Sequence, residues 1–337
     1  MPQAETSPKL SWPDLSAPAP APAAGFEKGS AFVDGRIVPI EEATIPLLDW
    51  GFLRSDAFQE TVSVWNGNVF RIADHLARFR RSGTRLRMPI GHSDDEIREI
   101  IHGLVRVCNF RNAYVQIINT RGRPPVGSRD LRLCESRFRA FCMPYMWLAP
   151  PSLQEQGMSL HVSSRVRVPP SSVDPMVKHY HWLDFEMGLL DAYDEGCETV
   201  VLQDGDGNVT EGPGFNIFAI IDGHLCTPKH NMLDGMTRRT VIEIAAHEGI
   251  PITETAIRVD KLTEAREIFL TTTAGGVIPV TNVDGQSVGN GRPGLVTARL
   301  HRLYWARREA GWNSDPIDYE KPLETVAVAN SSLTGDR

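Results

Sequence analysis

The chain has 337 residues, which is enough for about two domains with buried cores. Its 41% of hydrophobic and 23% of charged residues are ordinary for a globular protein. The net charge of −7 argues against a nucleic-acid binder that depends on neutralising phosphates. No apolar run approaches the roughly eighteen residues of a membrane span, and no basic-then-apolar signal peptide opens the chain. We therefore expect a cytoplasmic protein without a membrane or nucleic-acid partner.

Cysteine usage agrees with a reducing compartment. The chain has 5 cysteines, an odd number, and no two of them form a Cys-x-x-Cys pair. A structural zinc site or a disulfide framework needs closer clustering of its ligands. His179 and His181 flank Tyr180 at a spacing that suits one face of a strand, but they lack a cysteine or acidic partner at ligand spacing. We therefore predict no metal site.

The first half of the chain predicts an arm and a small domain. Proline and alanine dominate residues 1–29, which cannot bury enough apolar surface to order themselves, so we predict a disordered or extended arm. Residues 30–148 predict an α+β domain whose hairpins turn at Asp34–Gly35 and Asn66–Gly67. Its predicted strands cover 31–33, 36–40, 58–65, 69–72, 114–120 and 138–147, and its predicted helices cover 73–83 and, from a Ser-x-x-Glu capping box, 93–109.

The second half predicts a linker and a larger domain. Residues 149–157 (APPSLQEQG) have the proline and polar residues of a linker, and the hydrophobic pattern changes after them. Residues 158–337 then predict a C-terminal domain of strands and helices. Its predicted strands cover 160–168, 199–203, 209–215, 216–221, 224–227 and 267–273, and its predicted helices cover 180–195, 237–248, 261–265 and 294–309.

Lys178 is the candidate nucleophile. It is one of only six lysines, and it follows Met176 and Val177 just before an amphipathic helix. Apolar surroundings disfavour the ammonium form of a lysine, which leaves a neutral amine that can attack a carbonyl carbon. The alternative is a lysine whose stem lies along the helix while its charge stays in water.

Three further segments could join Lys178 in one site. Glu211 lies among the small residues of 208–216, which allow close approach of a ligand. The strand end 271–276 (TTTAGG) offers hydroxyls and backbone N–H groups to an anion, and 233–238 (LDGMTR) opens a helix whose N-terminus favours a phosphate. Each segment alone has the appearance of an ordinary turn or cap. A nucleophilic lysine, an acid and two phosphate-binding loops together are the parts of a pyridoxal-phosphate site.

With these segments in order, residues 29–319 resemble the class IV (fold-type-IV) aminotransferases, most closely the (R)-selective amine:pyruvate transaminases. The resemblance depends on several motifs at matching spacing. They are IPLLDWGF at 45–52, FR at 70–71 with HLAR at 75–78, DPMVKHYHW at 174–182, TEGPGFN at 210–216, GMTR at 235–238 and TTAGG at 272–276.

The resemblance implies an α+β, two-domain fold like that of D-amino-acid aminotransferase. The N-terminal domain would be small, and the larger C-terminal domain would have a β-barrel-like core. The resemblance also implies a homodimer with shared active sites, in which loops near 50–59 reach into the pocket of the neighbouring subunit.

The implied cofactor is pyridoxal 5'-phosphate. By the resemblance, Lys178 binds it covalently and moves the substrate proton, while Glu211 faces its pyridine nitrogen. Arg78 would clamp the phosphate, since arginine recognises phosphate through two parallel hydrogen bonds. The other implied contacts are Tyr180, Trp182, Gly214, Phe215, Asn216, the backbone amides of Met236 and Thr237, and the hydroxyls of Thr272 or Thr273.

Departures from the family pattern concern the substrate pocket. Arg54 stands where these transaminases usually have histidine, and Gln59 where they and their relatives place an aromatic residue. In relatives, the loop corresponding to 120–129 often carries a mobile arginine for the keto-acid carboxylate. Here Gly127 stands at the expected place, so Arg54 is our first candidate for that role, with Arg123 and Arg129 as alternatives. The implied substrate contacts are Arg54, Phe58, Gln59, Tyr114, Arg123, Arg129, Trp182 and Ala274.

The implied activity is ping-pong transfer of an amino group from an amine, which the resemblance leads us to expect in the R configuration, to a keto acid such as pyruvate. Within the family the alternatives are a D-amino-acid or branched-chain amino-acid aminotransferase and, behind them, a lyase resembling aminodeoxychorismate lyase. From another class, a non-catalytic protein that retained the cofactor fold would carry the same motifs.

Overall fold

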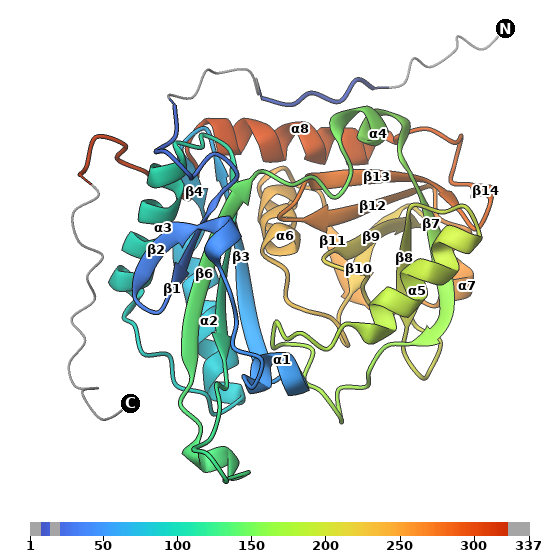
Figure 1. The fold of residues 1–337 in the computed structure, drawn as a ribbon. Helices are drawn as coiled ribbons and strands as arrows, with labels where there is room; N and C mark the ends of the chain where they lie inside the picture. Colours follow the sequence, from blue (N-terminus) through green and yellow to red (C-terminus); the bar gives the residue numbers. More distant parts are fainter. Residues whose placement is uncertain (1–7, 14–20, 323–337) are drawn as a thin grey trace, which may run out of the picture. The chain divides into compact units, whose positions relative to one another are not determined.

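The computed structural model describes residues 8–13 and 21–322. The chain divides into two compact units, each with its own sheet (Figure 1). We call 15–146 with 313–337 the N-terminal unit, and 1–14 with 147–312 the C-terminal unit. The chain is a mixed α+β protein, as predicted. No helix among the described residues is long and apolar enough to cross a membrane.

The N-terminal unit is an antiparallel sheet with two long helices on one face. Its elements are β1 (Ser30–Val33), β2 (Arg36–Pro39), η1 (Ile40–Glu42), α1 (Trp50–Arg54), β3 (Ala57–Trp65), β4 (Asn68–Phe70), α2 (Ile72–Arg85), α3 (Asp94–Cys108), β5 (Ala113–Thr120), η2 (Leu131–Leu133), β6 (Arg137–Pro144) and β15 (Ser314–Pro316). The strand order is β15-β4-β3-β5-β6-β1-β2. Helix α2 packs on β3, and α3 packs on β1, β5 and β6.

Local sequence signals account for the turns and for the start of α3. Asp34 and Gly35 have φ values of 48° and 78°, as a two-residue hairpin turn requires, and Asn66 with Gly67 repeats this conformation. The Ser93 side chain accepts from the backbone N–H of Glu96, whose carboxylate accepts from the Ser93 N–H, so the predicted capping box is present.

Alternation along β3 sends its side chains to two different environments. Phe58 points toward the helices, where its ring lies 4.8 Å from that of Phe79, and Glu60 follows it on the same face. Gln59 and Thr61 occupy the opposite face. Both faces of β3 are buried, although one is largely apolar and the other is polar.

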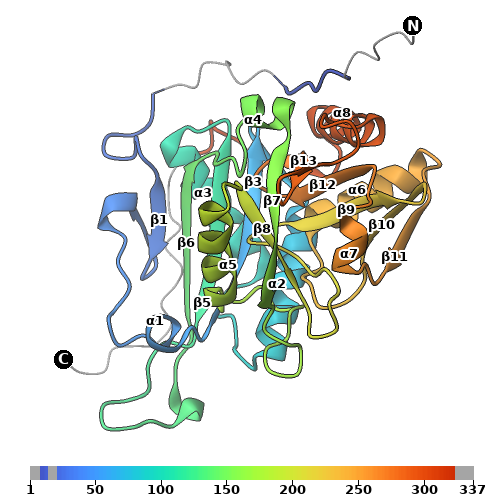
Figure 2. The ribbon, with the colours of Figure 1, turned by 90° about the vertical axis from the view of Figure 1, so that its right-hand side faces the viewer.

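The C-terminal unit is a mixed sheet with helices on it. Its elements are α4 (Pro151–Gln156), β7 (Met158–Val166), α5 (Leu183–Asp194), β8 (Thr199–Gln203), β9 (Asn216–Ile221), β10 (His224–Pro228), α6 (Met236–His247), β11 (Ile252–Thr255), α7 (Val259–Leu262), β12 (Glu267–Thr272), β13 (Gly276–Val283), β14 (Gln286–Ser287) and α8 (Leu295–Glu309). The strand order is β11-β10-β9-β12-β13-β7-β8, and β14 pairs with β13. Helix α6 lies beside α8 over β12 and β13, and α5 packs on β7 and β8 (Figures 1 and 2). The core includes Leu160, Ile217, Leu270 and Ile278.

The predicted linker 149–157 contains a helix instead. Proline occupies the first turn of α4, where its missing N–H costs nothing, so the same prolines that suggest a linker can start a helix. Gln154 is fully buried and donates to the Ala149 carbonyl at 2.8 Å, and Gly157 ends the helix with a φ of 82°. This prediction was therefore wrong: the segment is an ordered part of the C-terminal unit.

Part of the predicted arm is also ordered. In the C-terminal unit, the Trp12 ring lies edge-on to His301 of α8 at 4.9 Å, and His301 Nε2 lies 3.1 Å from the Ser11 carbonyl. Leu10 is buried as well. Burial of these apolar side chains stabilises 8–13 despite the proline-rich context, whereas 1–7 and 14–20 lie outside the described residues.

Two further expectations are corrected. The predicted strand 209–215 is an irregular segment that forms only isolated bridges, although Thr210 and Glu211 still exchange backbone hydrogen bonds with Leu202. After residue 312 the chain returns to the N-terminal unit, where β15 pairs with β4, so the predicted C-terminal domain does not continue unbroken to 337.

Candidate active site

The residues that the sequence assigned to a cofactor or substrate lie in both units. The N-terminal unit holds Arg54, Phe58, Gln59, Arg78, Tyr114, Arg123 and Arg129. The C-terminal unit holds Lys178, Tyr180, Trp182, Glu211, Gly214, Phe215, Asn216, Met236, Thr237, Thr272, Thr273 and Ala274.

Lys178 and Glu211 are electrostatic neighbours in the C-terminal unit. Lys178 is partly exposed in the irregular segment between β7 and α5, and α5 begins at Leu183, three residues later than predicted. Glu211 is 6% exposed and accepts the backbone N–H of Leu233 at 2.9 Å. Burial raises the pKa of Glu211, while the charge of Arg167, the hydrogen bond from Leu233 and the charge of Lys178 oppose that increase. The structure therefore brings the predicted nucleophile and acid together.

Arg167 is a buried neighbour of Glu211 that no sequence pattern indicated. Its Nη1 donates to Asp184 at 2.6 Å, and its guanidinium carbon lies 4.1 Å from the centre of the Phe185 ring. Its Nε lies 3.7 Å from a Glu211 oxygen, which is close for a charge but beyond a hydrogen bond. Arg167 ends an ordinary alternating strand segment, so no local signal distinguishes it from a surface arginine.

His179 and His181 form a polar pair beside the lysine. The His181 N–H donates to His179 Nδ1 at 3.1 Å, and the two rings are 5.4 Å apart. Burial and the nearby charge of Arg167 lower the pKa of His179 to about 4, so it is neutral at physiological pH. Across the described ranges, no group of three or more His, Cys, Asp or Glu side chains is arranged to hold a metal ion.

The N-terminus of α6 is suited to a phosphate. Gly235 is the N-cap of the helix and has no side chain. It therefore accepts no side-chain hydrogen bond from the amides of Met236 and Thr237. A Cβ at Gly235 would lie 1.9 Å from the Asn216 side-chain oxygen, so only glycine fits there. Asn216 donates to the Leu233 carbonyl at 2.9 Å, which attaches this loop to β9.

The loop after β12 is a second anion-binding candidate. Its turn requires glycine at Gly276, which has a φ of 73° and would place a Cβ 2.6 Å from the Tyr304 ring. The Ala274 N–H donates to the Thr272 hydroxyl at 3.2 Å, which leaves the hydroxyl proton of Thr272 for another acceptor. Hydrogen-bond donors for a phosphate and an acid for a ring nitrogen are the groups that pyridoxal phosphate would need, and the roles of this loop, the α6 N-terminus and Glu211 in binding it stay predictions.

Other predicted cofactor contacts have packing roles. Phe215 is buried in the core, and its ring would lie 2.1 Å from a Cβ at Gly212, so the glycine makes room for the ring. Trp182 precedes α5 and contacts Phe185 with ring centres 5.7 Å apart. A Cβ at Gly214 would lie 3.8 Å from the Trp182 ring.

Arg78 is buried in the N-terminal unit and is held by a carboxylate. Its Nε and Nη2 donate to the two oxygens of Glu60 at 2.6 and 2.8 Å, and His75 Nδ1 lies 2.8 Å from the same carboxylate. Burial raises the pKa of Glu60, but the charge and hydrogen bonds of Arg78 and His75 outweigh it and lower that pKa to about 2. Glu60 accepts from Nε and Nη2 of Arg78, and the phosphate contact that the resemblance implies for Arg78 stays a prediction.

The predicted substrate residues of the N-terminal unit do not share one environment. Gln59 and Tyr114 lie on the polar face of the sheet and are linked through Thr61, whereas Phe58 is fully buried on the opposite face. Arg54 is exposed, and its guanidinium lies 3.7 Å from the centre of the Trp50 ring. Arg123 and Arg129 are exposed on the loop between β5 and β6. All three candidate arginines therefore remain open for the keto-acid carboxylate.

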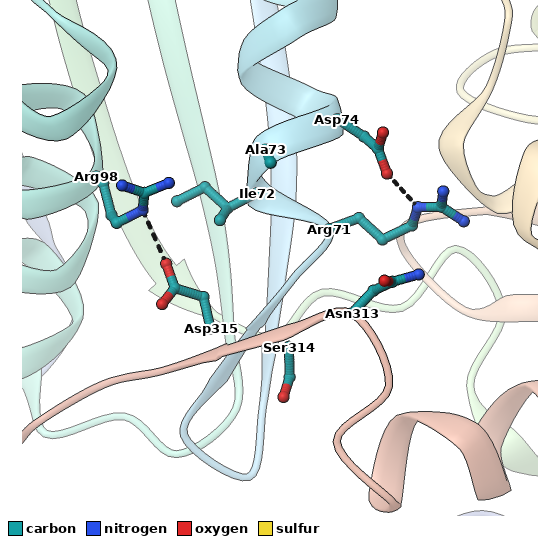
Figure 3. Close-up of a pocket in the computed structure, with 8 residues that line it drawn as sticks. All are labelled: Arg71, Ile72, Ala73, Asp74, Arg98, Asn313, Ser314 and Asp315. Carbon is teal, nitrogen blue, oxygen red and sulfur yellow. Dashed lines mark hydrogen bonds and ion pairs between the residues drawn. The ribbon is translucent and has the colours of Figure 1, made fainter.

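A cavity of about 540 Å³ at the start of α2 is separate from these residues. Figure 3 shows its two arginines, each directed at a carboxylate: Arg71 contacts Asp74 at 2.7 Å, and Arg98 contacts Asp315 at 3.0 Å. Because the paired charges balance, the cavity does not attract an anion in the way that an isolated arginine would.

The comparisons with known proteins agree with this chemistry. The family model of the class IV amino-transferases matches residues 57–283. A putative branched-chain-amino-acid aminotransferase of Methanocaldococcus jannaschii is 32% identical over 275 residues, which cover 81% of this chain and 94% of that protein. The chain belongs to the class IV aminotransferases. Members of this family use pyridoxal phosphate.

Other relatives of this aminotransferase differ in their named substrates. A D-alanine aminotransferase of Staphylococcus haemolyticus is 28% identical over 80% of this chain and 94% of its own length. The solved branched-chain amino acid aminotransferase of Escherichia coli has a TM-score of 0.81 at 26% identity, covering 86% of this chain and all of that one. That of Thermobaculum terrenum, solved in its PLP-form, has a TM-score of 0.75 at 25% identity, covering 87% of this chain and 99% of that one. The family and its fold are therefore established, whereas the substrate is a separate question.

Proposed function

We propose that this aminotransferase transfers the amino group of a primary amine, of R configuration, to a keto acid such as pyruvate in two half-reactions. The observation that carries the transamination chemistry is Glu211. It is a buried acid, and the nearby charge of Lys178 acts to lower the pKa of its carboxyl group. The motifs around Lys178, Glu211 and Gly235 support the amine donor by their resemblance to the (R)-selective amine transaminases.

Each residue has a definite task in such a reaction. Pyridoxal phosphate, when bound, supplies the carbonyl that exchanges amines and the ring that accepts electrons. The Lys178 amine takes the proton from the substrate carbon and returns it, acting as base and then acid. The Glu211 carboxylate holds a proton at the pyridine nitrogen, and the first turn of α6 binds the phosphate. Arg167 favours the ionised form of Glu211.

An amino-acid donor is the second candidate. The relatives named above are branched-chain-amino-acid and D-alanine aminotransferases, which favours a donor with a carboxylate. Presenting (R)-1-phenylethylamine, D-alanine and L-leucine separately to the holoenzyme, with pyruvate or 2-oxoglutarate as acceptor, distinguishes the candidates. We expect the first donor to react fastest, and indifference to it would replace the amine proposal with an amino-acid aminotransferase. Release of pyruvate without an acceptor would instead indicate a lyase.

Substitution of Lys178 tests the transaminase proposal itself. We expect Lys178→Ala to bind the cofactor non-covalently and to lose conversion of donor to ketone. The absorbance of the cofactor in the wild-type holoenzyme should decrease when the donor is added and recover when pyruvate is added. Normal turnover by Lys178→Ala, or a wild-type protein that never takes up the cofactor, would contradict the proposal.

We also propose a cytoplasmic homodimer. Exposed apolar side chains gather before and within α1, including Leu47 at 71% and Phe52 at 59% exposure, with Leu48 and Leu53 beside them. Such a patch favours association with a second copy. The free state of all five cysteines supports the reducing compartment. Sedimentation equilibrium of the wild type and Leu47→Glu/Phe52→Glu is the test: the double variant should be monomeric.

A further inference from the structure

We propose that two copies of this chain pack together through the outer face of helix α5, with the two helices antiparallel and related by a two-fold axis that passes near Gly188. This inference rests on the proposed homodimer, because it names a surface through which the copies associate. It goes beyond that proposal by giving the contact residues, their pairing and the direction of the two helices.

The first observation is an apolar stripe on the outer face of α5. The helix packs on β7 and β8 with its inner face, where Phe185 and Ala192 are buried, and Figure 2 shows it in front of these strands. An α-helix turns by about 100° per residue, so four further apolar positions lie within an arc of about 120° on the opposite face. All four side chains are exposed: Leu183 at 80%, Met187 at 43%, Leu190 at 55% and Tyr193 at 57%.

This stripe has no cover within the part of the chain that the structure describes, since its four side chains are exposed. A helix that is apolar on two opposite faces is normally covered on both of them. Contiguous exposed apolar side chains mark a surface that binds another molecule. The outer face of α5 is therefore an interaction surface.

The order of residues along the stripe indicates that the partner is a second copy of α5. Leu183 lies five positions before Gly188 and Tyr193 five positions after it, while Met187 lies one position before and Leu190 two positions after. In an antiparallel pair with its axis near Gly188, Leu183 of one copy therefore meets the partner subunit's Tyr193, and Met187 meets the partner subunit's Leu190. A two-fold interface requires this self-complementarity, because each contact between two residues occurs twice.

The charges at the two ends of α5 favour the antiparallel direction. Asp194 and Glu195 are exposed at the C-terminal end, and the last turn contains no basic side chain. Negative charge is unfavourable beside a helix C-terminus, but the N-terminus of an antiparallel neighbour stabilises it. His181 is exposed seven positions before Gly188 and Glu195 lies seven positions after it, so they come level with each other across the pair. A parallel pair would instead bring the acidic ends together.

The α5 stripe adds to the exposed side chains around α1 and does not replace them. A stable interface buries about 800 Å² of each partner, which is more than four side chains of one helix supply. Substitutions on either surface should therefore weaken association of the copies.

Thiol cross-linking tests the pairing of residues. Leu183→Cys/Tyr193→Cys places the two thiols of one copy opposite those of the other, at positions that face each other across the axis. Oxidised glutathione takes the two hydrogen atoms of each thiol pair and is itself reduced to two thiols, so each disulfide forms without another oxidant. We expect the holoenzyme of this variant to become a covalent dimer in more than half of its chains, as measured by non-reducing gel electrophoresis.

The two single variants are the matched controls, and the wild type with its own 5 cysteines gives the background. In the antiparallel pair, position 183 of one copy and position 183 of the other are offset by about 15 Å along the helix axis, because each residue adds 1.5 Å. A disulfide needs Cα atoms within about 7 Å of each other. We expect neither Leu183→Cys nor Tyr193→Cys alone to cross-link above background. Cross-linking of either single variant would indicate parallel packing and would overturn the inference.

Negative charges placed in the stripe test its contribution to association. Leu183→Glu/Leu190→Glu changes two exposed positions of a helix, so the fold should be retained, as circular dichroism and urea denaturation can check. We expect the Kd of the dimer, measured by sedimentation equilibrium, to rise at least 100-fold. Leu295→Glu is the matched control, because Leu295 of α8 is 67% exposed but lies outside the stripe, and its Kd should stay within twofold of wild type.

The outcomes separate this inference from the proposed function. If the wild type is a dimer but Leu183→Cys/Tyr193→Cys does not cross-link above background, the α5 contact is wrong and the proposed homodimer is unaffected. A wild type that is monomeric at micromolar concentration would overturn both. A protein that cross-links as expected but converts no donor would support the α5 contact and refute only the proposed transaminase activity.

Discussion

Two buried glutamates, one in each unit, each lie beside a buried arginine but differ in ionisation behaviour. Glu60 receives two hydrogen bonds from Arg78 and one contact from His75, and its pKa is lowered to about 2. Glu211 lies 3.7 Å from Arg167, whose nearest hydrogen bond goes to Asp184, and the pKa of Glu211 is raised by burial. Direct hydrogen bonds from Arg78 and the His75 contact outweigh burial at Glu60, whereas at Glu211, which has no hydrogen bond from Arg167, burial dominates.

The difference indicates which carboxylate is available for chemistry. Both Glu60 oxygens are already bonded to Arg78, so this carboxylate positions the arginine rather than a ligand. Glu211 accepts one backbone N–H within the described ranges and keeps acceptor capacity for a further donor. Glu211 is therefore the glutamate for which we predict the chemical role, and Glu60 the one for which we predict a supporting role.

Removal of the Glu60 charge should have the largest effect on stability. Glu60→Gln leaves the Arg78 guanidinium buried without its counter-charge and turns an N–H group of the new amide toward it. We expect a loss of about 3–5 kcal/mol in the free energy of unfolding, measured by urea denaturation. The exposed pair of Lys28 and Glu41 supplies the control, because Glu41→Gln should leave the free energy of unfolding nearly unchanged.

Removal of the Glu211 charge should lower activity strongly and change stability little. We expect Glu211→Gln to lower kcat about 100-fold, because the ring nitrogen loses its charged partner. Stability should change by less than about 1 kcal/mol, since burial already disfavours the charged form of Glu211. Stopped-flow half-reactions and urea denaturation check the two parts. A large loss of stability with normal turnover would assign Glu211 a structural role like that of Glu60.

Removal of the Arg167 charge should make Glu211 still harder to ionise. Arg167→Met deletes the cation that opposes the burial effect, so the pKa of Glu211 should rise further. It also removes the hydrogen bond to Asp184, at a cost of about 1–3 kcal/mol in stability. The acidic limb of the activity–pH profile should therefore move to higher pH. An unchanged profile would show that Arg167 only anchors Asp184.

The contributions of Glu60 and Glu211 to stability should change with pH in opposite directions. The pKa of Glu60 is depressed, so its stabilisation is present above pH 4.5 and is lost as the pH falls toward 2. The pKa of Glu211 is raised, so its contribution is present below pH 4.5 and is lost as the pH rises through its folded value. The difference in free energy of unfolding between wild type and Glu60→Gln should become smaller in acid. The free energy of unfolding of Glu211→Gln should increase relative to that of the wild type as the pH rises. Denaturation between pH 3 and 8 measures both trends.

Much of the fold and part of the site could be predicted from local patterns. The hairpin turn at Asn66–Gly67 and the Ser93 capping box were found where the sequence indicated them, because each depends on residues next to one another. Lys178 was singled out by its apolar neighbours. The α4 helix was missed because prolines open a helix as readily as they form a linker.

The sequence by itself determined the chemical inventory of this aminotransferase: a lysine, an acid and glycine-bearing loops in a fixed order, since these motifs depend on local backbone conformation. Only the tertiary structure decided which charges meet. Glu60 precedes Arg78 by 18 positions, and Arg167 precedes Glu211 by 44, so their contacts depend on strand register and helix packing rather than on neighbouring residues. The same register turns Gln59 and Thr61 toward Tyr114 while Phe58 enters the core, because successive side chains of a strand point to opposite faces.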